Sequence, residues 1–234
     1  KIVEIIMEYA PIGVFALLAG LIVDLAGDDP NNIITTLTPL LYYALTVIIG
    51  LTFMVFIFYP LIIYIKTGIT IKQFLKAIFP AQMLAFSTSS SAATLPLTMK
   101  RVEKNLNVSD EVTSFVCPLG ATINMDGTSI HQAISAVFIA QAFGQDLTLI
   151  DQLAIVLTAT LSSIGAAAVP GAGLIMLVIV LGAIGIDPQG LALIIAIDRP
   201  LDMLRTVVNV TGDATVASVV ASTEGEKIKY KKDE

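Results

Sequence analysis

The sequence predicts an all-α membrane protein with two opposed re-entrant helical hairpins and broken transmembrane helices, arranged as an inverted repeat. Three observations support this fold class. Hydrophobic residues make up 56% of the 234 residues and charged residues only 14%, too little charge to cover a soluble domain. Several apolar runs reach or approach the roughly 20 residues that a helix needs to cross a bilayer. Two successive segments also carry polar breaks at corresponding positions.

The first two elements are predicted as plain membrane helices. Residues 1–31 contain an apolar run over 2–25, which is long enough to span the hydrocarbon layer. Residues 32–70 contain a longer run over 32–65, and a helix of that length crosses the bilayer with a tilt.

A hairpin and a broken helix are predicted next. Residues 71–108 are apolar but are interrupted by the serine-rich run 87–91, which we interpret as the tip of a re-entrant hairpin. Residues 109–146 form the following helix, and the sequence Asn-Met-Asp-Gly-Thr at 124–128 breaks it.

The same order of elements then repeats. Residues 147–187 are interrupted at 162–165 and again at 168–173, which predicts a second hairpin. Residues 188–222 form a last helix that carries polar residues inside an apolar sequence, and residues 223–234 form a polar tail.

The placement of basic residues supports hairpins rather than simple spans. Apart from Arg199 and Arg205, the lysines and arginines lie at Lys1, between Lys66 and Lys104, or in the tail. If both hairpins return to the side from which they enter, every basic connection falls on one face, which the positive-inside bias makes cytoplasmic. We therefore expect a multi-pass protein of the plasma membrane with a cytoplasmic C-terminus. The alternative is that the small and polar residues only allow close packing of helices.

One face of the last helix carries a stripe of polar side chains. Asp198, Asp202, Arg205, Asn209 and Asp213 are spaced by 4, 3, 4 and 4 residues, so they share one side of a helix that turns about 100° per residue. An ionisable group at membrane depth costs at least about 2.5–3.5 kcal/mol, so the stripe should face partners or a cavity. Ion pairs that only hold helices together are the structural alternative.

The stripe offers sites for both ends of an acidic amino acid. Arg205 carries a permanent charge and a planar fork suited to a carboxylate, and Asp202, about one turn away, suits an ammonium group. Asp213 and Asp126 are hard oxygen donors beside broken backbone, which favours a small cation such as sodium. Zinc is disfavoured because His131 is the only histidine, and we expect it to be a packing residue.

Other features narrow the functional class. The net charge of −6 argues against nucleic-acid binding, and the single cysteine, Cys117, excludes an internal disulfide. The N–H groups that follow the run 89–91 can attract a carboxylate if a half-helix begins there. Gly165 and the run 169–173 supply a flexible turn that can act as a gate.

Taken together, these motifs resemble the dicarboxylate/amino acid:cation symporter family, the glutamate transporter family. The resemblance covers nearly the whole chain and is carried by five segments, at 10–15, 87–96, 120–128, 163–173 and 202–213. It implies the glutamate-transporter fold and a sodium-coupled member of the bacterial type. It also implies that the chain holds the fifth to eighth membrane helices with both hairpins, the C-terminal part of such a protein.

The resemblance assigns roles in binding aspartate or glutamate. Asp202 would hold the amino group, Arg205 with Thr128 the side-chain carboxylate, and Asn209 the α-carboxylate. The hairpin tip formed by Ser89, Ser90 and Ser91 would bind that α-carboxylate too. The remaining substrate-binding candidates are Met125, Val169, Pro170, Gly171, Asp198, Arg199 and Thr206.

The resemblance also implies that sodium ions are transported, not used in catalysis, and it places three of them. The first would be held by Asp213 with carbonyls of Gly120, Asn124 and Asn209. The second would lie among carbonyls of Thr122, Ser163, Ile164 and Ala166. Asp126 and Asn124 would share the third with a helix outside this chain.

Family membership would also imply a homotrimer in the lipid bilayer. Residues 1–31 would belong to its scaffold and residues 32–70 to a transport domain that moves like an elevator. The second hairpin would be the gate.

Several positions depart from the family pattern. Some archaeal relatives carry an arginine where Ser89 stands, and Arg199 is our candidate for the equivalent charge. Ala168 replaces a usual glycine, which would stiffen the gate. Gln132 stands where animal relatives have a proton-carrying glutamate, so we expect no proton counter-transport. Asp213 favours sodium, because proton-coupled bacterial relatives tend to have asparagine there.

Alternative functions remain open at this point. A carrier of the same family could take neutral amino acids or C4-dicarboxylates, but Arg205 disfavours the first and Asp202 the second. An intramembrane aspartyl protease is the enzymatic alternative, although an arginine on the same stripe disfavours the protonated carboxyl that such a dyad needs. A simple channel is a further alternative.

Overall fold

The computed structural model describes residues 12, 15, 19 and 31–232, with side chains described from residue 37 onward in the second range. The predicted first helix, residues 1–31, therefore lies outside the described residues except for Ile12, Phe15, Ala19 and Asn31. Within this part of the chain every regular element is helical, which confirms the all-α prediction there. The elements are α2 (Asn31–Phe53), the π-helical turn η1 (Met54–Phe58), α3 (Tyr59–Thr67), α4 (Ile71–Thr88), α5 (Ser91–Leu106), α6 (Asp110–Ile123), α7 (Asp126–Ala142), α8 (Leu149–Ile164), α9 (Ala172–Ala183), the 3-10 turn η2 (Pro188–Leu191) and α10 (Ala192–Thr223).

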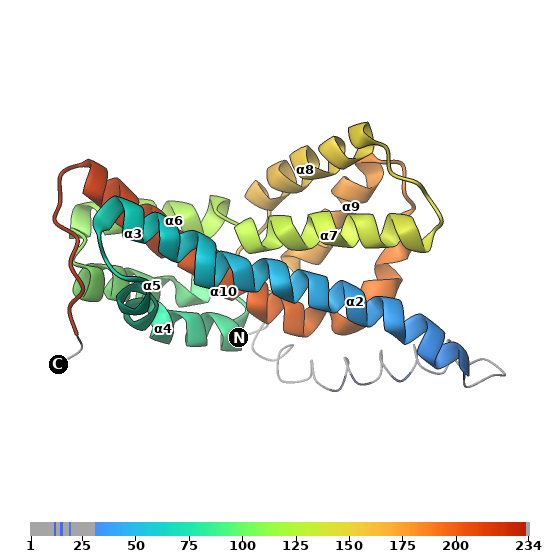
Figure 1. The fold of residues 1–234 in the computed structure, drawn as a ribbon, viewed down its shortest axis with the longest axis horizontal. Coiled ribbons are helices and arrows are strands. Elements are labelled where there is room, and N and C mark those ends of the chain that lie inside the picture. The colour runs from blue at the N-terminus through green and yellow to red at the C-terminus, as the bar shows by residue number, and fades with distance from the viewer. Residues whose placement is uncertain (1–11, 13–14, 16–18, 20–30, 233–234) are drawn as a thin grey trace.

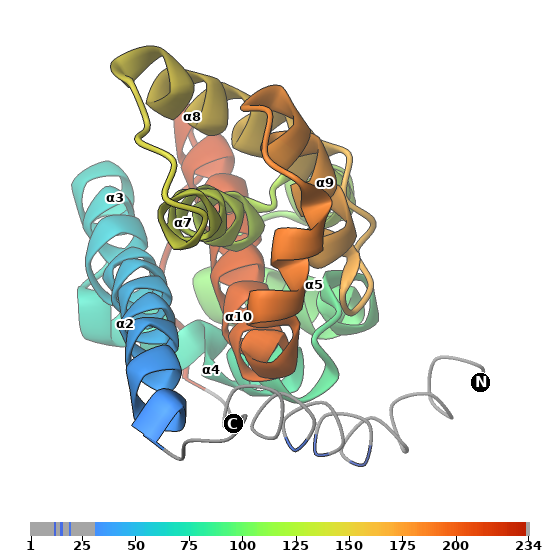
Figure 2. The same ribbon diagram turned by 90° about the vertical axis from the view of Figure 1, so that its right-hand side faces the viewer.

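The last helix, α10, is the centre of the fold. It contacts α2 to α7 and α9, and the end-on view shows the other helices arranged around it (Figure 2). Helices α3 to α6 lie toward one end of α10 and α7 to α9 toward the other, while α2 runs alongside (Figure 1). A polar stripe on α10 is therefore surrounded by protein along its length.

Each segment predicted as a hairpin or broken helix consists of two shorter helices. In 71–108 the helices α4 and α5 meet at Ser89 and Ser90, and in 109–146 the helices α6 and α7 meet at Asn124 and Met125. In 147–187 the helices α8 and α9 are separated by residues 165–171. Breaks of this kind expose backbone N–H and C=O groups inside the molecule, where they can bind ligands.

The outer surface is apolar along the helix that α2, η1 and α3 form together. Leu37–Thr67 is the one helix among the described residues that is long and apolar enough to cross a membrane by itself. Its exposed side chains include Leu41, Tyr42, Ile49 and Phe53. An exposed apolar face of this length favours contact with lipid.

Both hairpins begin with the same local structure. The side chain of Thr70 accepts from the backbone N–H of Gln73, whose side chain accepts from the N–H of Thr70, and Thr148 and Asp151 form the same capping box at the start of α8. A capping box satisfies two N–H groups that a helix leaves free at its first turn. The first helices of the two hairpins, α4 and α8, thus begin with the same N-terminal capping motif.

The C-terminal tail is tied to the start of α6. The Glu226 carboxylate accepts from the backbone N–H of Ser109 at 2.8 Å and from its hydroxyl at 2.6 Å. The N–H of Lys231 donates to the carbonyl of Asn105 at 2.8 Å, and Ile228 is buried. The polar tail therefore packs on the end of the fold that carries α5 and α6.

Candidate functional site

The polar stripe of α10 lies inside the protein. Asp198, Asp202, Arg205, Asn209 and Asp213 are each at most 7% exposed. Buried charges require partners because removing them from water costs several kcal/mol. Some of the partners are other charged residues of α10, and the rest come from α7 and from the breaks between helices.

Arg205 is the best-connected charge of the stripe. Its Nη2 lies 2.7 Å from Oδ1 of Asp202, and its Nη1 lies 3.1 Å from Oδ1 of Asp198. Nη1 also lies 2.6 Å from Nδ1 of His131. Among the described residues, its Nε has no hydrogen-bond partner although it is buried. One donor of the guanidinium is therefore available to a ligand.

His131, which we expected to be a packing residue, is buried and also has hydrogen-bond partners at both ring nitrogens. A guanidinium can only donate, so Nδ1 of His131 accepts the bond from Arg205. Nε2 lies 2.9 Å from the hydroxyl of Tyr43, which itself lies 2.8 Å from the hydroxyl of Ser135. Arg205 and Tyr43 lie 74 and 88 residues from His131 in the sequence, so no local pattern predicts these contacts. Only the four-residue spacing between His131 and Ser135 indicates a polar face on α7.

Two predicted residues flank Asp202 on α10. Nη1 of Arg199 lies 3.4 Å from its Oδ2, and the side chain of Arg199 is 22% exposed. The hydroxyl of Thr206 donates to the carbonyl of Asp202 at 2.9 Å. Arg199 therefore reaches the same carboxylate as Arg205, from the more exposed side.

The tips of the two hairpins meet beside the stripe. The hydroxyl of Ser90 donates to the carbonyl of Ala168 at 2.7 Å, and the N–H of Gly171 donates to Oδ2 of Asp202 at 3.0 Å. In the part of the chain that the structure describes, the hydroxyls of Ser89 and Ser91 are buried without a hydrogen-bond partner. The first tip therefore presents two free hydroxyl groups next to the second tip.

A small cavity lies between these tips and α10. Its volume is about 20 Å³, which is room for a single water molecule. Its lining residues are Ser89, Ser91, Met125, Thr128, Ala166, Ala167, Ala168, Val169, Gly173, Asp202, Thr206 and Asn209. Pro170, at the second tip, is half-buried beside them. Many of the predicted substrate-binding residues thus line one small cavity.

Asn209 holds the break between α6 and α7. Its side-chain oxygen accepts from the backbone N–H of Gly127 at 2.8 Å, which satisfies a free donor in the first turn of α7. Its amide nitrogen donates to the sulfur of Met125 at 3.2 Å and lies 3.5 Å from the hydroxyl of Thr128. The polar stripe therefore fixes where the second half of the broken helix begins.

Gly127 allows α7 to approach α10 closely. A Cβ at this position would lie 2.5 Å from the carbonyl oxygen of Arg205 and 3.0 Å from Cβ of Val208. We expect Gly127→Ala to lower the unfolding temperature of the purified protein by several degrees, because the backbones must separate. Gly182→Ala is the matched control, since nothing lies within 4 Å of a Cβ there. Equal unfolding temperatures for the two variants would contradict this interpretation.

A second cluster surrounds Asp213 and Asp126. The amide of Asn124 donates to Oδ1 of Asp213 at 3.0 Å, and a Cβ on Gly120 would overlap the same carboxylate. The hydroxyl of Tyr59 donates to Oδ2 of Asp126 at 2.6 Å. Carboxylate oxygens beside a broken helix suit a small hard cation. Tyr59 was absent from the predicted site, because no sequence pattern connects it with Asp126.

The residues of the second predicted sodium site do not form a buried cluster like the one around Asp213 and Asp126. Thr122 and Ile164 are exposed, and the hydroxyls of Thr122 and Ser163 donate to carbonyls of their own helices, at Leu119 and Thr160. Ala166 lies instead in the lining of the small cavity. A cation here would depend on backbone carbonyls and on a rearrangement of the second hairpin.

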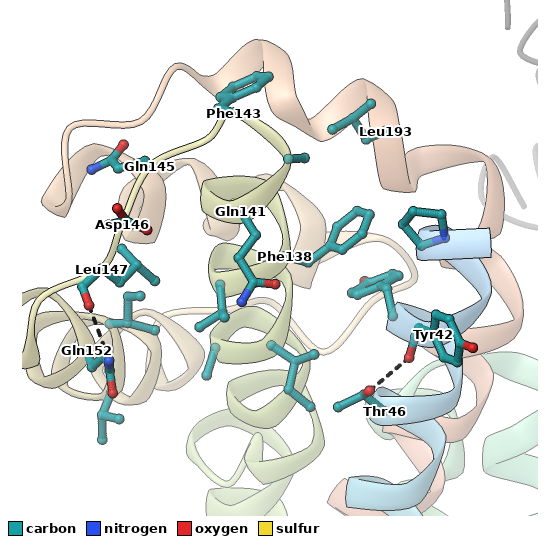
Figure 3. Close-up of a pocket in the computed structure, with 18 of the residues that line it drawn as sticks. Tyr42, Thr46, Phe138, Gln141, Phe143, Gln145, Asp146, Leu147, Gln152 and Leu193 are labelled. Atoms are coloured by element: carbon teal, nitrogen blue, oxygen red, sulfur yellow. Dashed lines mark hydrogen bonds between the residues drawn. The ribbon is translucent and has the colours of Figure 1, made fainter. Parts of the chain in front are cut away.

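A larger cavity of about 1180 Å³ lies to one side, between α2, α7 and the start of α8 (Figure 3). Phe138 and Gln141 of α7 and Tyr42 of α2 line it, and the charged residues of the α10 stripe do not. It therefore lacks the charge pair that a zwitterion needs. Tyr43 borders this cavity and also contacts His131, so the cavity adjoins the network around Arg205.

Comparisons with known proteins identify the family of the chain. The profile of the sodium:dicarboxylate symporter family matches residues 1–223. The chain is 43% identical over 220 residues to an excitatory amino acid transporter of Caenorhabditis elegans, which covers 94% of this chain and 43% of that protein. It is 45% identical over 220 residues to excitatory amino acid transporter 1 of Ambystoma tigrinum, covering 94% and 40%. It is 42% identical over 229 residues to excitatory amino acid transporter 1 of Homo sapiens, covering 98% and 41%.

The match covers only part of each relative but nearly all of this chain. The chain spans about two fifths of the length of each, and the matched part includes all the described residues of α10 and both hairpins. The match over nearly the whole chain shows that this protein belongs to the sodium:dicarboxylate symporter family.

Proposed function

We propose that the full-length protein is a secondary active transporter that moves aspartate or glutamate into the cell together with sodium. One observation carries this proposal. Within the part of the chain that the structure describes, three buried donors near Asp202 have no partner: the hydroxyls of Ser89 and Ser91, which line the small cavity with Asp202, and the Nε of Arg205, whose guanidinium pairs with Asp202. An unsatisfied buried donor costs about 1–3 kcal/mol, and the two carboxylates of an acidic amino acid would supply the missing acceptors. The excitatory amino acid transporters among the relatives support the same substrate class.

Binding on this proposal is an exchange of ion pairs. Arg205 now pairs with Asp202 at 2.7 Å. The ammonium group of the substrate would take Asp202, and its side-chain carboxylate would take Arg205 with help from Thr128. Because the substrate brings one positive and one negative group to this pair, Asp202 and Arg205 both keep a partner of opposite charge. Asn209 and the first hairpin tip would bind the α-carboxylate.

The second hairpin is proposed as the gate. The cavity of about 20 Å³ is too small for an amino acid, so residues 166–173 must move to admit one. Gly171 has a φ of 78° and bonds to Asp202 through its N–H, and the carbonyl of Ala168 accepts from Ser90, so release of the tip requires at least these two bonds to break. Substrate that occupies Asp202 would replace the bond from Gly171.

Sodium is proposed to bind near Asp213 and Asp126, with Asn124, Gly120 and Asn209 as the other ligands. The second sodium site at 122, 163, 164 and 166 remains a proposal that depends on hairpin movement. Gln132 is proposed to carry no proton, since its amide donates to the carbonyl of Gly173 at 3.0 Å and accepts from the hydroxyl of Ser162 at 2.7 Å.

The larger architecture is also a proposal. We infer two opposed re-entrant hairpins in an inverted repeat, an elevator movement, and a homotrimer in the plasma membrane with a cytoplasmic C-terminus. The shared capping boxes of α4 and α8 support the repeat, and the basic residues near 66–104 and in the tail support the orientation. The bacterial type of the protein stays a prediction.

Each alternative substrate would leave one charged residue of the site without a partner. A neutral amino acid would leave Arg205 without its new acceptor, and a C4-dicarboxylate would leave Asp202 without an ammonium group. Family membership excludes the intramembrane protease, because the family is one of symporters.

Uptake of radiolabelled aspartate into liposomes containing the full-length protein tests the proposal. We expect aspartate to accumulate at least about ten-fold above its external concentration when an inward sodium gradient is present, and only to equilibrate when choline replaces sodium. Excess serine and succinate should compete poorly with aspartate. Equilibration without accumulation under the sodium gradient would instead indicate a channel and would contradict the proposal.

A further inference from the structure

The helix Leu37–Thr67 contains a wide turn at Met54–Phe58. The N–H of Tyr59 donates to the carbonyl of Met54, five residues earlier, within the π-helical turn Met54–Phe58. The next residue, Pro60, has no N–H and cannot donate to the carbonyl four residues before it. Short π-helical turns inside α-helices are frequent at functional sites. The proline thus accounts for the break in the regular hydrogen bonding.

The wide turn places a single tyrosine inside the protein. One extra residue in a turn rotates everything that follows by about 100° relative to an uninterrupted helix. Phe56, Ile57 and Phe58 are 42–56% exposed, whereas Tyr59 directly after them is 3% exposed. Its ring lies against Gly212 of α10, where a Cβ would be 2.8 Å from the tyrosine oxygen. The glycine therefore leaves the space that the hydroxyl occupies.

The hydroxyl is aimed at the cation cluster. It donates to Oδ2 of Asp126 at 2.6 Å and leaves Oδ1 of the same carboxylate to a cation. A Cβ on Gly212 would also lie 2.6 Å from the amide nitrogen of Asn124, which holds Asp213. Tyr59 and Asn124 therefore orient the two carboxylates of the cluster from neighbouring positions around Gly212.

We infer that Tyr59 is a positioning residue for cation binding: the wide turn above Pro60 directs its hydroxyl to Asp126 and fixes that carboxylate for sodium. The inference rests on the proposed sodium coupling. Partners that orient the ligands of a metal commonly change its affinity by 10–100-fold when they are removed. Tyr59 is thus expected to set sodium affinity without touching the amino acid.

The test is a sodium titration of the purified full-length protein without substrate. The unfolding temperature is measured against sodium chloride concentration, with choline chloride holding the ionic strength constant, because a ligand of the native state raises that temperature. We expect Tyr59→Phe to shift the midpoint to about ten-fold higher sodium. Tyr64→Phe, on the same helix at a side chain 54% exposed, should leave the midpoint unchanged.

Two further variants separate positioning from general damage. Pro60→Ala restores the missing N–H while keeping every side chain of the cluster, and it should shift the sodium midpoint in the same direction as Tyr59→Phe. In the double variant with Asp126→Asn, the tyrosine change should add almost nothing, because the two residues act through one bond. Unchanged midpoints in Tyr59→Phe, or shifts that add fully to that of Asp126→Asn, would overturn the inference. A wild-type protein that does not respond to sodium would instead contradict the proposed function.

Discussion

Replacing Arg205 by alanine is expected to lower the affinity for aspartate by at least about 30-fold. The guanidinium is 1% exposed and pairs with Asp202, so its loss removes the hydrogen-bond donor for the side-chain carboxylate of the substrate and leaves the buried carboxylate of Asp202 without its partner. Removing one member of a buried hydrogen-bonded charge pair costs about 2–5 kcal/mol, and about 1.4 kcal/mol corresponds to a factor of ten. Competition binding with labelled aspartate on the full-length protein measures the change.

Serine provides the internal control for this variant. It carries the same ammonium and α-carboxylate groups as aspartate but no side-chain charge, so its affinity should fall far less in Arg205→Ala than that of aspartate. The ratio of the two affinities is insensitive to how much of the protein is active. If the variant binds aspartate as tightly as the wild type, our assignment of Arg205 to the acidic end is wrong.

Changing Asp213 to asparagine is expected to raise the sodium concentration for half-maximal aspartate uptake by about 10–100-fold. The change keeps the shape of the side chain and its ability to accept from Asn124, but removes the charge that a buried cation needs. Uptake measured over a range of sodium, with choline as replacement, gives the half-maximal concentration.

Asp146→Asn is the matched control, because it makes the same chemical change on an exposed connection between α7 and α8. Its half-maximal sodium concentration should equal that of the wild type. Equal values for Asp213→Asn and the wild type would remove Asp213 from the proposed sodium ligands.

The polar stripe could be predicted because it is local. Asp198, Asp202, Arg205, Asn209 and Asp213 lie on one uninterrupted helix, so the helical period alone places them on one side. The cost of charge in hydrocarbon then requires that side to face the interior. The breaks at the serine-rich run and at Asn124 were visible for a similar reason, since polar residues interrupt apolar sequence there.

The contacts of Tyr43, Tyr59 and His131 could not be predicted in this way. Tyr43 lies 88 residues from His131, and Tyr59 lies 67 residues from Asp126. In an apolar helix, the sequence around a tyrosine does not show whether its side chain faces lipid or a carboxylate. Which way Tyr59 points depends on a π-helical turn, and a proline within a membrane helix does not by itself specify that geometry. The periodicity of a single helix shows which of its residues share a face, but not which residues of distant helices that face contacts. The structure shows these contacts because it places the helices relative to one another.

The hydrogen bond between Ser90 and Ala168 joins segments that are 78 residues apart. One neutral hydrogen bond contributes about 0.5–1.5 kcal/mol, which biases an equilibrium by roughly two- to ten-fold. If the second hairpin is the gate that we propose, a link of this strength holds the two tips together in most molecules and still lets them separate. Because Asp202 and Gln132 also bond to the second tip, several weak hydrogen bonds rather than one strong contact would set how easily it opens.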